Sequence, residues 1–106
     1  PVTMFGEVYL CRFPYTDGVG SKVRPALVLF DFGEDAVVCR VTGRLREGSM
    51  NVPINEWSQA GLLKPSIVRL DKIITAERSV FLRKLGVLSD RDLEAVRSRW
   101  NEHLRL

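Results

Sequence analysis

The stretch that decides the fold runs from Ser21 to Phe30 and reads SKVRPALVLF. Pro25 sets its own φ and disfavours helix at Arg24, so this segment is expected to be extended. The nearly unbroken apolar run that follows is typical of a central strand buried on both faces. Arg24 then has two interpretations: its stem packs over the edge of the core, or its guanidinium points at an anion.

Further strand signals lie on both sides of this stretch. GEVYLCRF (6–13) is followed by a turn rich in Gly, Asp and Pro (14–21). GED (33–35) is a hairpin signal before AVVCRVTGR (36–44), in which alternation makes one face polar toward the end. The other expected elements are a mobile basic loop at 43–52, a strand at 65–77, and a strand or extended piece with a turn at Gly86 within 79–89.

Two helices are predicted. A short one at 54–62 has Asn55 as its cap and Gly61 beyond its end. The final helix starts with a capping-box pattern formed by Ser89 and Asp92. Its apolar stripe, expected to pack on the sheet, is Leu93, Val96, Trp100 and Leu104.

Short strands joined by turns and closed by an amphipathic helix predict the α+β class, with a small curved sheet or barrel. A length of 106 residues and 45% hydrophobic content fit a single domain over 1–106. The net charge of +3 is compatible with an anionic partner but does not require one.

The sequence also indicates the cellular compartment. No signal-peptide pattern opens the chain, and no window approaches the roughly 18 continuous apolar residues of a membrane span. We therefore expect a cytoplasmic protein that does not enter the membrane. Cys11 and Cys39 lack CxxC spacing and are expected to be buried thiols in a reducing compartment.

Several chemistries are excluded. His103 is the only histidine and lies on the polar side of the final helix, so a Ser/His/Asp or Cys/His arrangement has no base. No spacing predicts a zinc site or a Walker or Rossmann glycine pattern, so we expect no metal and no cofactor. Arginine, carboxylate, hydroxyl and lysine remain. They suffice for RNA cleavage, because the substrate's own 2′-hydroxyl attacks the adjacent phosphate.

Four residues are candidates for this chemistry. Arg24 stands at a strand start, Thr42 at the polar end of a strand, and Arg69 and Asp71 have the i, i+2 spacing that places both on one sheet face. A guanidinium suits a phosphorane but is a poor base. Ordinary alternatives are a solvated strand edge for Arg24, a β-former for Thr42, and a surface ion pair for the other two.

Read in order, several segments together resemble a known family. They are GEVY (6–9), RPALV (24–28), VT (41–42), VRLDK (68–72), IT (74–75) and LGVLS (85–89). The chain resembles the MazF/PemK toxins, the ribonuclease half of type II toxin-antitoxin systems. The resemblance implies an SH3-like barrel with a C-terminal helix, a homodimer and inhibition by a cognate antitoxin. It also implies metal-independent cleavage of single-stranded RNA that leaves a 2′,3′-cyclic phosphate.

The resemblance also implies residue roles. Arg24 matches the arginine of the RP motif and Thr42 the threonine that ends the third strand, while Arg69 and Asp71 match the pair of the PemK-like branch. In this mechanism Asp71 or Thr42 assists proton movement, and the two arginines stabilise the phosphorane. Lys22, Arg44 and Arg46 hold flanking phosphates or are solvated loop charges, and Tyr15 is placed to stack on a base.

One departure from the family's pattern leaves the identity of the general base open. Some family members carry Glu or His in the turn before the RP motif, whereas this chain has neither, and Asp17 is the nearest acid. Two alternatives stay open at this point. One is a non-catalytic small-barrel binding module, and the other is a toxin of similar fold that poisons a topoisomerase.

Overall fold

The computed structural model describes residues 4–15 and 17–106. Residues 1–3 and residue 16, which falls in the expected turn at 14–21, lie outside the described residues. In chain order the elements are β1 (Glu7–Pro14), β2 (Ser21–Asp31), β3 (Asp35–Thr42), β4 (Asn51–Ile54), β5 (Ser66–Glu77), the 3₁₀ helix η1 (Arg78–Val80), β6 (Phe81–Val87) and α1 (Asp90–His103).

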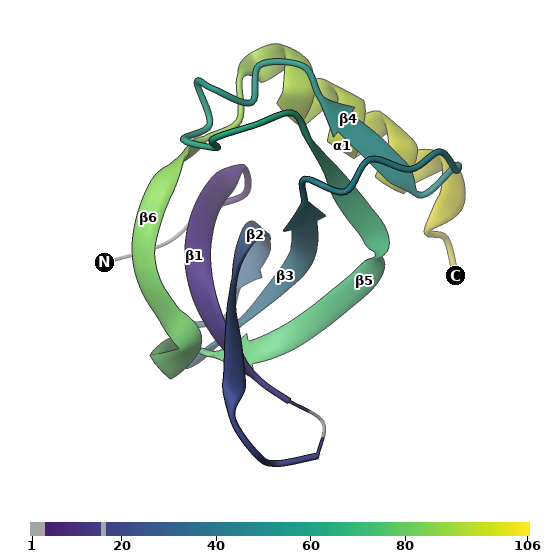
Figure 1. Cartoon of the computed structure of the whole chain (residues 1–106). Helices are drawn as coiled ribbons and strands as arrows, with labels where there is room; N and C mark the ends of the chain where they lie inside the picture. The colour runs from purple at the N-terminus through teal and green to yellow at the C-terminus, as the bar shows by residue number, and fades with distance from the viewer. Residues whose placement is uncertain (1–3, 16) are drawn as a thin grey trace.

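The strands form one antiparallel sheet with the order β4-β5-β3-β2-β1-β6. Figure 1 shows the sheet curving into an open barrel with α1 at one end. The prediction of an α+β fold with a curved, barrel-like sheet and a C-terminal helix is confirmed. β2 is central, pairs with β1 and β3, and buries Ala26 to Leu29 as its apolar run predicts.

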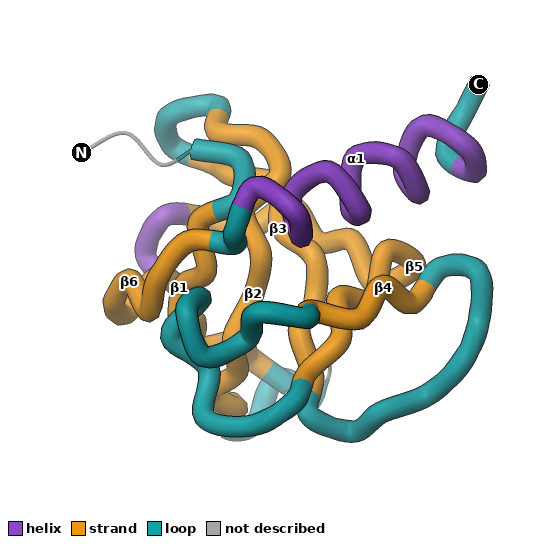
Figure 2. Tube along the Cα trace, turned by 90° about the horizontal axis from the view of Figure 1, so that it is seen from above, coloured by secondary structure: helices purple, strands orange, loops and turns teal. Residues whose placement is uncertain are grey.

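Helix α1 packs across the strands and completes the main core (Figure 2). It begins as its capping pattern predicts, because the Ser89 hydroxyl accepts a hydrogen bond from the backbone N–H of Asp92 at 3.2 Å. The predicted stripe packs against the sheet residues of this core: Leu93, Val96, Trp100 and Leu104. Trp57 also packs on this core. The described residues include no helix with the length and apolar character needed to span a membrane.

The prediction of a short helix at 54–62 is wrong. This segment forms successive turns, with backbone hydrogen bonds of three different spans: Ala60 to Glu56, Gly61 to Ser58 and Leu62 to Trp57. Its first N–H groups, those of Asn55 and Glu56, are taken by the buried Asp92 carboxylate at 3.0 and 2.8 Å. The expected basic loop is also shorter than predicted, because strand β4 begins at Asn51.

The turn segment 55–62 also packs against the far edge of the sheet. A Cβ atom added at Gly61 would overlap the Leu85 carbonyl oxygen, and one added at Gly86 would lie 2.6 Å from the Ala60 carbonyl oxygen. The backbone at 60–61 therefore lies directly against β6. Because this segment follows β4 in the chain, it links the two open edges of the barrel.

Both cysteines are free and fully buried, as predicted. Burial raises the pKa of the Cys11 and Cys39 thiols to about 12. At neutral pH they are protonated and chemically inert.

Candidate functional site

Strand pairing brings the candidate arginines to one face of the sheet. Arg40 on β3 lies opposite Ala26 on β2 and opposite Arg69 on β5. Residues directly opposite in antiparallel strands point to the same side, and alternation adds Arg24 and Thr42 to that side. The other side of β3, which carries Cys39 and Val41, belongs to the main core beneath α1. The basic face therefore lies away from α1, and it also carries a second buried cluster of Cys11, Ala26, Val28 and Val38.

A groove of about 880 Å³ lies where β2 begins and β3 ends. Arg24 and Thr42 both line it, together with the turn segment at Gly61 and Leu62 and with Leu85 of β6. Of the described residues that line it, none is acidic and four are cationic: Arg24, Arg44, Lys64 and Arg83. The groove therefore offers apolar walls and a concentrated positive charge to an anionic chain.

Local backbone contacts orient the hydroxyl of Thr42. Its Oγ1 accepts a hydrogen bond from the backbone N–H of Arg44 at 3.1 Å. A hydroxyl that accepts in this way still has its own hydrogen to donate. Thr42 can therefore donate a hydrogen bond or a proton into the groove.

A second hollow, of about 320 Å³, shares Arg24 with the groove. Tyr15, which is half exposed, lies at the β1-β2 connection and lines this hollow with Phe13. Lys22, Arg24 and Arg40 supply its charge, and none of the described residues lining it is acidic. Arg24 thus lines two open hollows, each with further cationic residues in its lining.

The remaining candidates lie beside these hollows. Arg69 donates from Nη2 to Oδ2 of Asp71 at 3.2 Å, and the side chains are 13% and 43% exposed. Neither residue lines the groove or the second hollow, but Arg69 is the cross-strand neighbour of Arg40. Arg46 is exposed and also lies outside both linings, although its charge acts on Arg40.

Three cationic residues of the site were not predicted: Arg40, Lys64 and Arg83. The alternation of β3 placed Arg40 on the polar face with Thr42, which was a usable signal. No sequence signal marked Lys64 or Arg83, because only the packing of the turn segment and β6 around the barrel end brings them to the groove.

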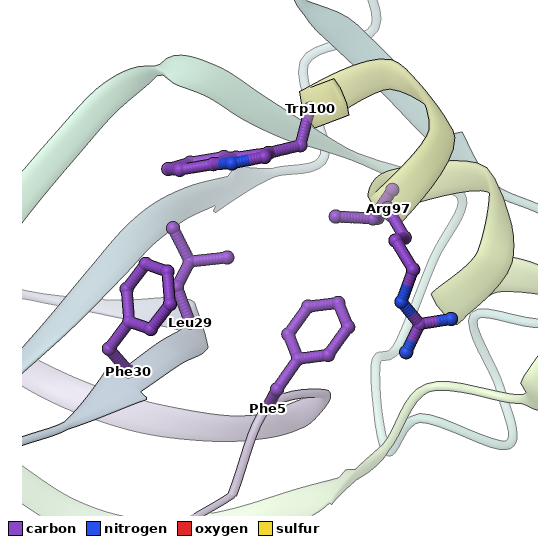
Figure 3. Close-up of a pocket in the computed structure, with 6 residues that line it drawn as sticks. Phe5, Leu29, Phe30, Arg97 and Trp100 are labelled. Atoms are coloured by element: carbon purple, nitrogen blue, oxygen red, sulfur yellow. The ribbon is translucent and has the colours of Figure 1, made fainter. Parts of the chain in front are cut away.

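A third hollow differs in character. It is an apolar cavity of about 190 Å³ between α1, β2 and the segment before β1. Figure 3 shows Phe5, Phe30 and Trp100 around it, with Arg97 at its side. The Arg97 guanidinium lies 5.4 Å from the centre of the Phe5 ring. Apart from Arg97, the described residues that line it are apolar, so the lining offers no acid-base group.

A small curved sheet with a groove of four cations where β2 begins and β3 ends is typical of a protein that binds an anionic polymer. The family model of the PemK-like, MazF-like toxins of type II toxin-antitoxin systems matches residues 4–104. The chain therefore belongs to this family, as its segments had indicated.

Solved structures with the same fold include members of this family. The toxin MazF-mt6 of Mycobacterium tuberculosis matches with a TM-score of 0.75 and 22% identity, over 91% of this chain and 93% of that one. A MazE-MazF structure from Deinococcus radiodurans matches with a TM-score of 0.78 and 21% identity, over 98% and 96%. An endoribonuclease from a mycobacterial species in complex with its cognate antitoxin matches with a TM-score of 0.76 and 19% identity, over 97% and 95%. A comparison with curated proteins finds no match.

Proposed function

We propose that this protein is an endoribonuclease toxin that cleaves single-stranded RNA at short sequence motifs. The observation that carries the proposal is the groove in which Arg24 and Thr42 face the same space among four cations and no described acid. Membership of the PemK-like, MazF-like family and the fold shared with a mycobacterial endoribonuclease support it.

The proposed reaction is a transesterification within the RNA, in which the phosphoryl group passes from the 5′-oxygen to the 2′-oxygen. The 2′-oxygen forms a bond to phosphorus, the bond from phosphorus to the 5′-oxygen breaks, and the products are a 2′,3′-cyclic phosphate and a 5′-hydroxyl. One proton leaves the attacking 2′-hydroxyl and one reaches the departing 5′-oxygen. The protein must therefore move two protons and stabilise a phosphorane that is more negative than the ground state.

Each candidate residue fits one of these tasks. Arg24 stabilises the phosphorane with a planar fork that can bind two oxygens, and Thr42 donates to the departing oxygen. Arg69 adds positive charge farther along the same face, and Asp71 is the carboxylate able to accept the first proton. Arg44, Lys22 and Arg46 hold flanking phosphates, and Tyr15 stacks on a base.

The same surface suits a regulating partner. The mycobacterial relative is described with its cognate antitoxin, and the Deinococcus structure contains MazE with MazF. We propose that a cognate antitoxin inhibits this protein by occupying the cationic groove, and that the toxin acts as a homodimer in the cytoplasm. An acidic antitoxin segment would complement the four cations that line the groove.

Incubation of the purified protein, freed of co-purifying partners, with a long, weakly structured RNA in excess EDTA tests the nuclease. The described residues hold no group of three His, Cys, Asp or Glu side chains that could bind a metal ion, so we expect cleavage to continue. Mapped fragments should end in a 2′,3′-cyclic phosphate. Folded protein that leaves several RNAs intact would contradict the proposal and favour a binding module or another toxin target.

Variants connect this activity to the groove. Arg24→Ala should lower the cleavage rate by about 100-fold or more, because one donor to the developing charge is lost. Arg91→Ala on the exposed side of α1 is the matched control, since it removes the same charge at a position that does not line the groove. Equal activity of Arg24→Ala and the control would show that Arg24 has no catalytic role.

A further inference from the structure

Arg40 is held in an unfavourable setting. Its Nε is buried and has no hydrogen-bond partner among the described residues, and the same is true of Nε of its neighbour Arg69. Burial, followed by the charges of Arg24, Arg69 and Arg46, lowers the pKa of Arg40 below its usual range. Three neighbouring guanidinium groups therefore act on Arg40.

The free protein compensates this charge only in part. Asp71 pairs with Arg69 at 3.2 Å, and no salt bridge of Arg24, Arg40 or Arg46 occurs among the described residues. A buried donor without an acceptor and a cluster of like charges both cost folding free energy. An anion seated between Arg40 and Arg24 would relieve the repulsion between these like charges.

The surroundings of Arg40 indicate the kind of anion. Arg40 lines the second hollow opposite an aromatic side formed by Phe13 and Tyr15, with Lys22 and Arg24 as the other charged groups. Single-stranded nucleic acids bind to surfaces that combine cations for the backbone with aromatic rings for the bases. The exposed Tyr15 ring favours a nucleotide, because each base of a single strand presents a flat face that can stack on it.

We propose that the second hollow is a subsite for a nucleotide next to the cleaved bond, and that Arg40 binds the phosphate of that nucleotide. The inference rests on the proposed function, because Arg24 is the wall common to both hollows. RNA then runs from the groove across Arg24 into the second hollow. Arg40 destabilises the free protein and stabilises the complex, which distinguishes it from a residue that serves only the fold.

The test uses Arg40→Met, which keeps an apolar stem of similar reach and removes the charge, beside the exposed helix control Arg91→Met. The probe is a mixed-sequence single-stranded DNA octamer, which lacks the 2′-hydroxyl and cannot be cleaved by this reaction. Affinity is measured at several salt concentrations, and Tm is measured without ligand. We expect Arg40→Met to weaken binding about tenfold and to reduce the salt slope by about 0.7, while its Tm rises.

Three outcomes would overturn the inference. In one, Arg40→Met binds the octamer with unchanged affinity and salt slope. In another, its Tm falls and the slope is unchanged, which is the signature of a packing role. In the third, Arg40→Met loses affinity for a Glu-rich peptide but keeps its affinity for DNA, which would assign the hollow to an acidic protein segment.

The outcome of this binding test can be distinguished from the outcome of the nuclease test. If the wild type cleaves RNA and Arg40→Met binds DNA as the wild type does, the inference alone fails. If the wild type cleaves no RNA but Arg40→Met shows the expected loss of DNA affinity and salt slope, the nuclease proposal fails, and what stands is that Arg40 binds a nucleic-acid phosphate in the second hollow.

Discussion

At the scale of single residues, Thr42 offers the sharpest test of the chemistry. Its hydroxyl accepts from the Arg44 N–H and faces the groove beside Arg24. Thr42→Ser keeps the oxygen, whereas Thr42→Val keeps the shape and removes it. We expect the serine variant to stay within about tenfold of the wild-type rate and the valine variant to lose about 100-fold, in the range of a general acid. Single-turnover cleavage measures both.

Stability distinguishes this role from a structural one. Thr42→Val also leaves the Arg44 N–H without its side-chain acceptor, but that group is exposed and can bind water. The Tm of both variants should therefore stay close to that of the wild type. Equal cleavage by Thr42→Val and Thr42→Ser would remove Thr42 from the mechanism.

The residues of the site differ in how far sequence could predict them. Arg24 and Thr42 were predicted, and the fold places both in one groove because β2 starts where β3 ends. Arg40 was placed on the right face, but its significance depends on lying opposite Arg69. A register shift between Cys39 and Arg40 sets that pairing, and no short-range pattern predicts such a bulge.

At the scale of elements, the contact between the turn segment 55–62 and β6 requires a glycine at position 61. Gly61 has a φ of +82°, and a Cβ there would overlap the Leu85 carbonyl oxygen. Gly33 has a φ of +96° but nothing within 4 Å of an added Cβ. Gly61→Ala should therefore lower Tm more than Gly33→Ala, because it adds a clash to the same backbone strain.

Thermal unfolding of the two variants measures this difference. Cleavage should fall as well in Gly61→Ala, since Gly61 and its neighbour Leu62 line the groove, whereas Gly33 lies at the β2-β3 hairpin. Similar Tm values for the two variants would show that the turn segment does not depend on its contact with β6.

The same segment shows where sequence reasoning fails for elements. Alternating and apolar runs predicted β2, β3 and the final helix, because local pattern and burial agree there. At 54–62 the signals of a cap at Asn55 and a stop at Gly61 suggested a helix. Asp92, more than thirty residues away in the chain, binds the Asn55 and Glu56 N–H groups instead, and Gly61 serves the contact with β6. Both the Asp92 hydrogen bonds and the Gly61 contact are tertiary interactions, which a local sequence pattern does not show.

At the scale of the whole molecule, the buried thiols link stability to alkaline pH. Burial raises the pKa of Cys11 and Cys39 from 9.0 to about 12 in the fold. Above pH 9 the unfolded chain loses protons that the folded chain keeps, so unfolding becomes easier as pH rises. The stabilisation is complete below pH 9 and is lost as pH approaches 12.

Urea unfolding between pH 8 and pH 11 measures this slope. Replacing both cysteines by alanine should lower stability at every pH, because buried volume is lost, but should flatten the decline above pH 9. An equally steep alkaline decline in the double variant would mean that other groups cause it.

In the proposed mechanism the RNA supplies the nucleophile and the protein supplies the charged groove. The sharpest test uses a short oligoribonucleotide that contains one mapped cleavage site, together with a copy in which only the nucleotide 5′ of the cut carries a 2′-hydrogen. We expect the protein to bind both within about threefold and to cleave the first alone. Cleavage of the 2′-deoxy copy at the same bond would contradict it, because the attacking oxygen would then come from water or from the protein.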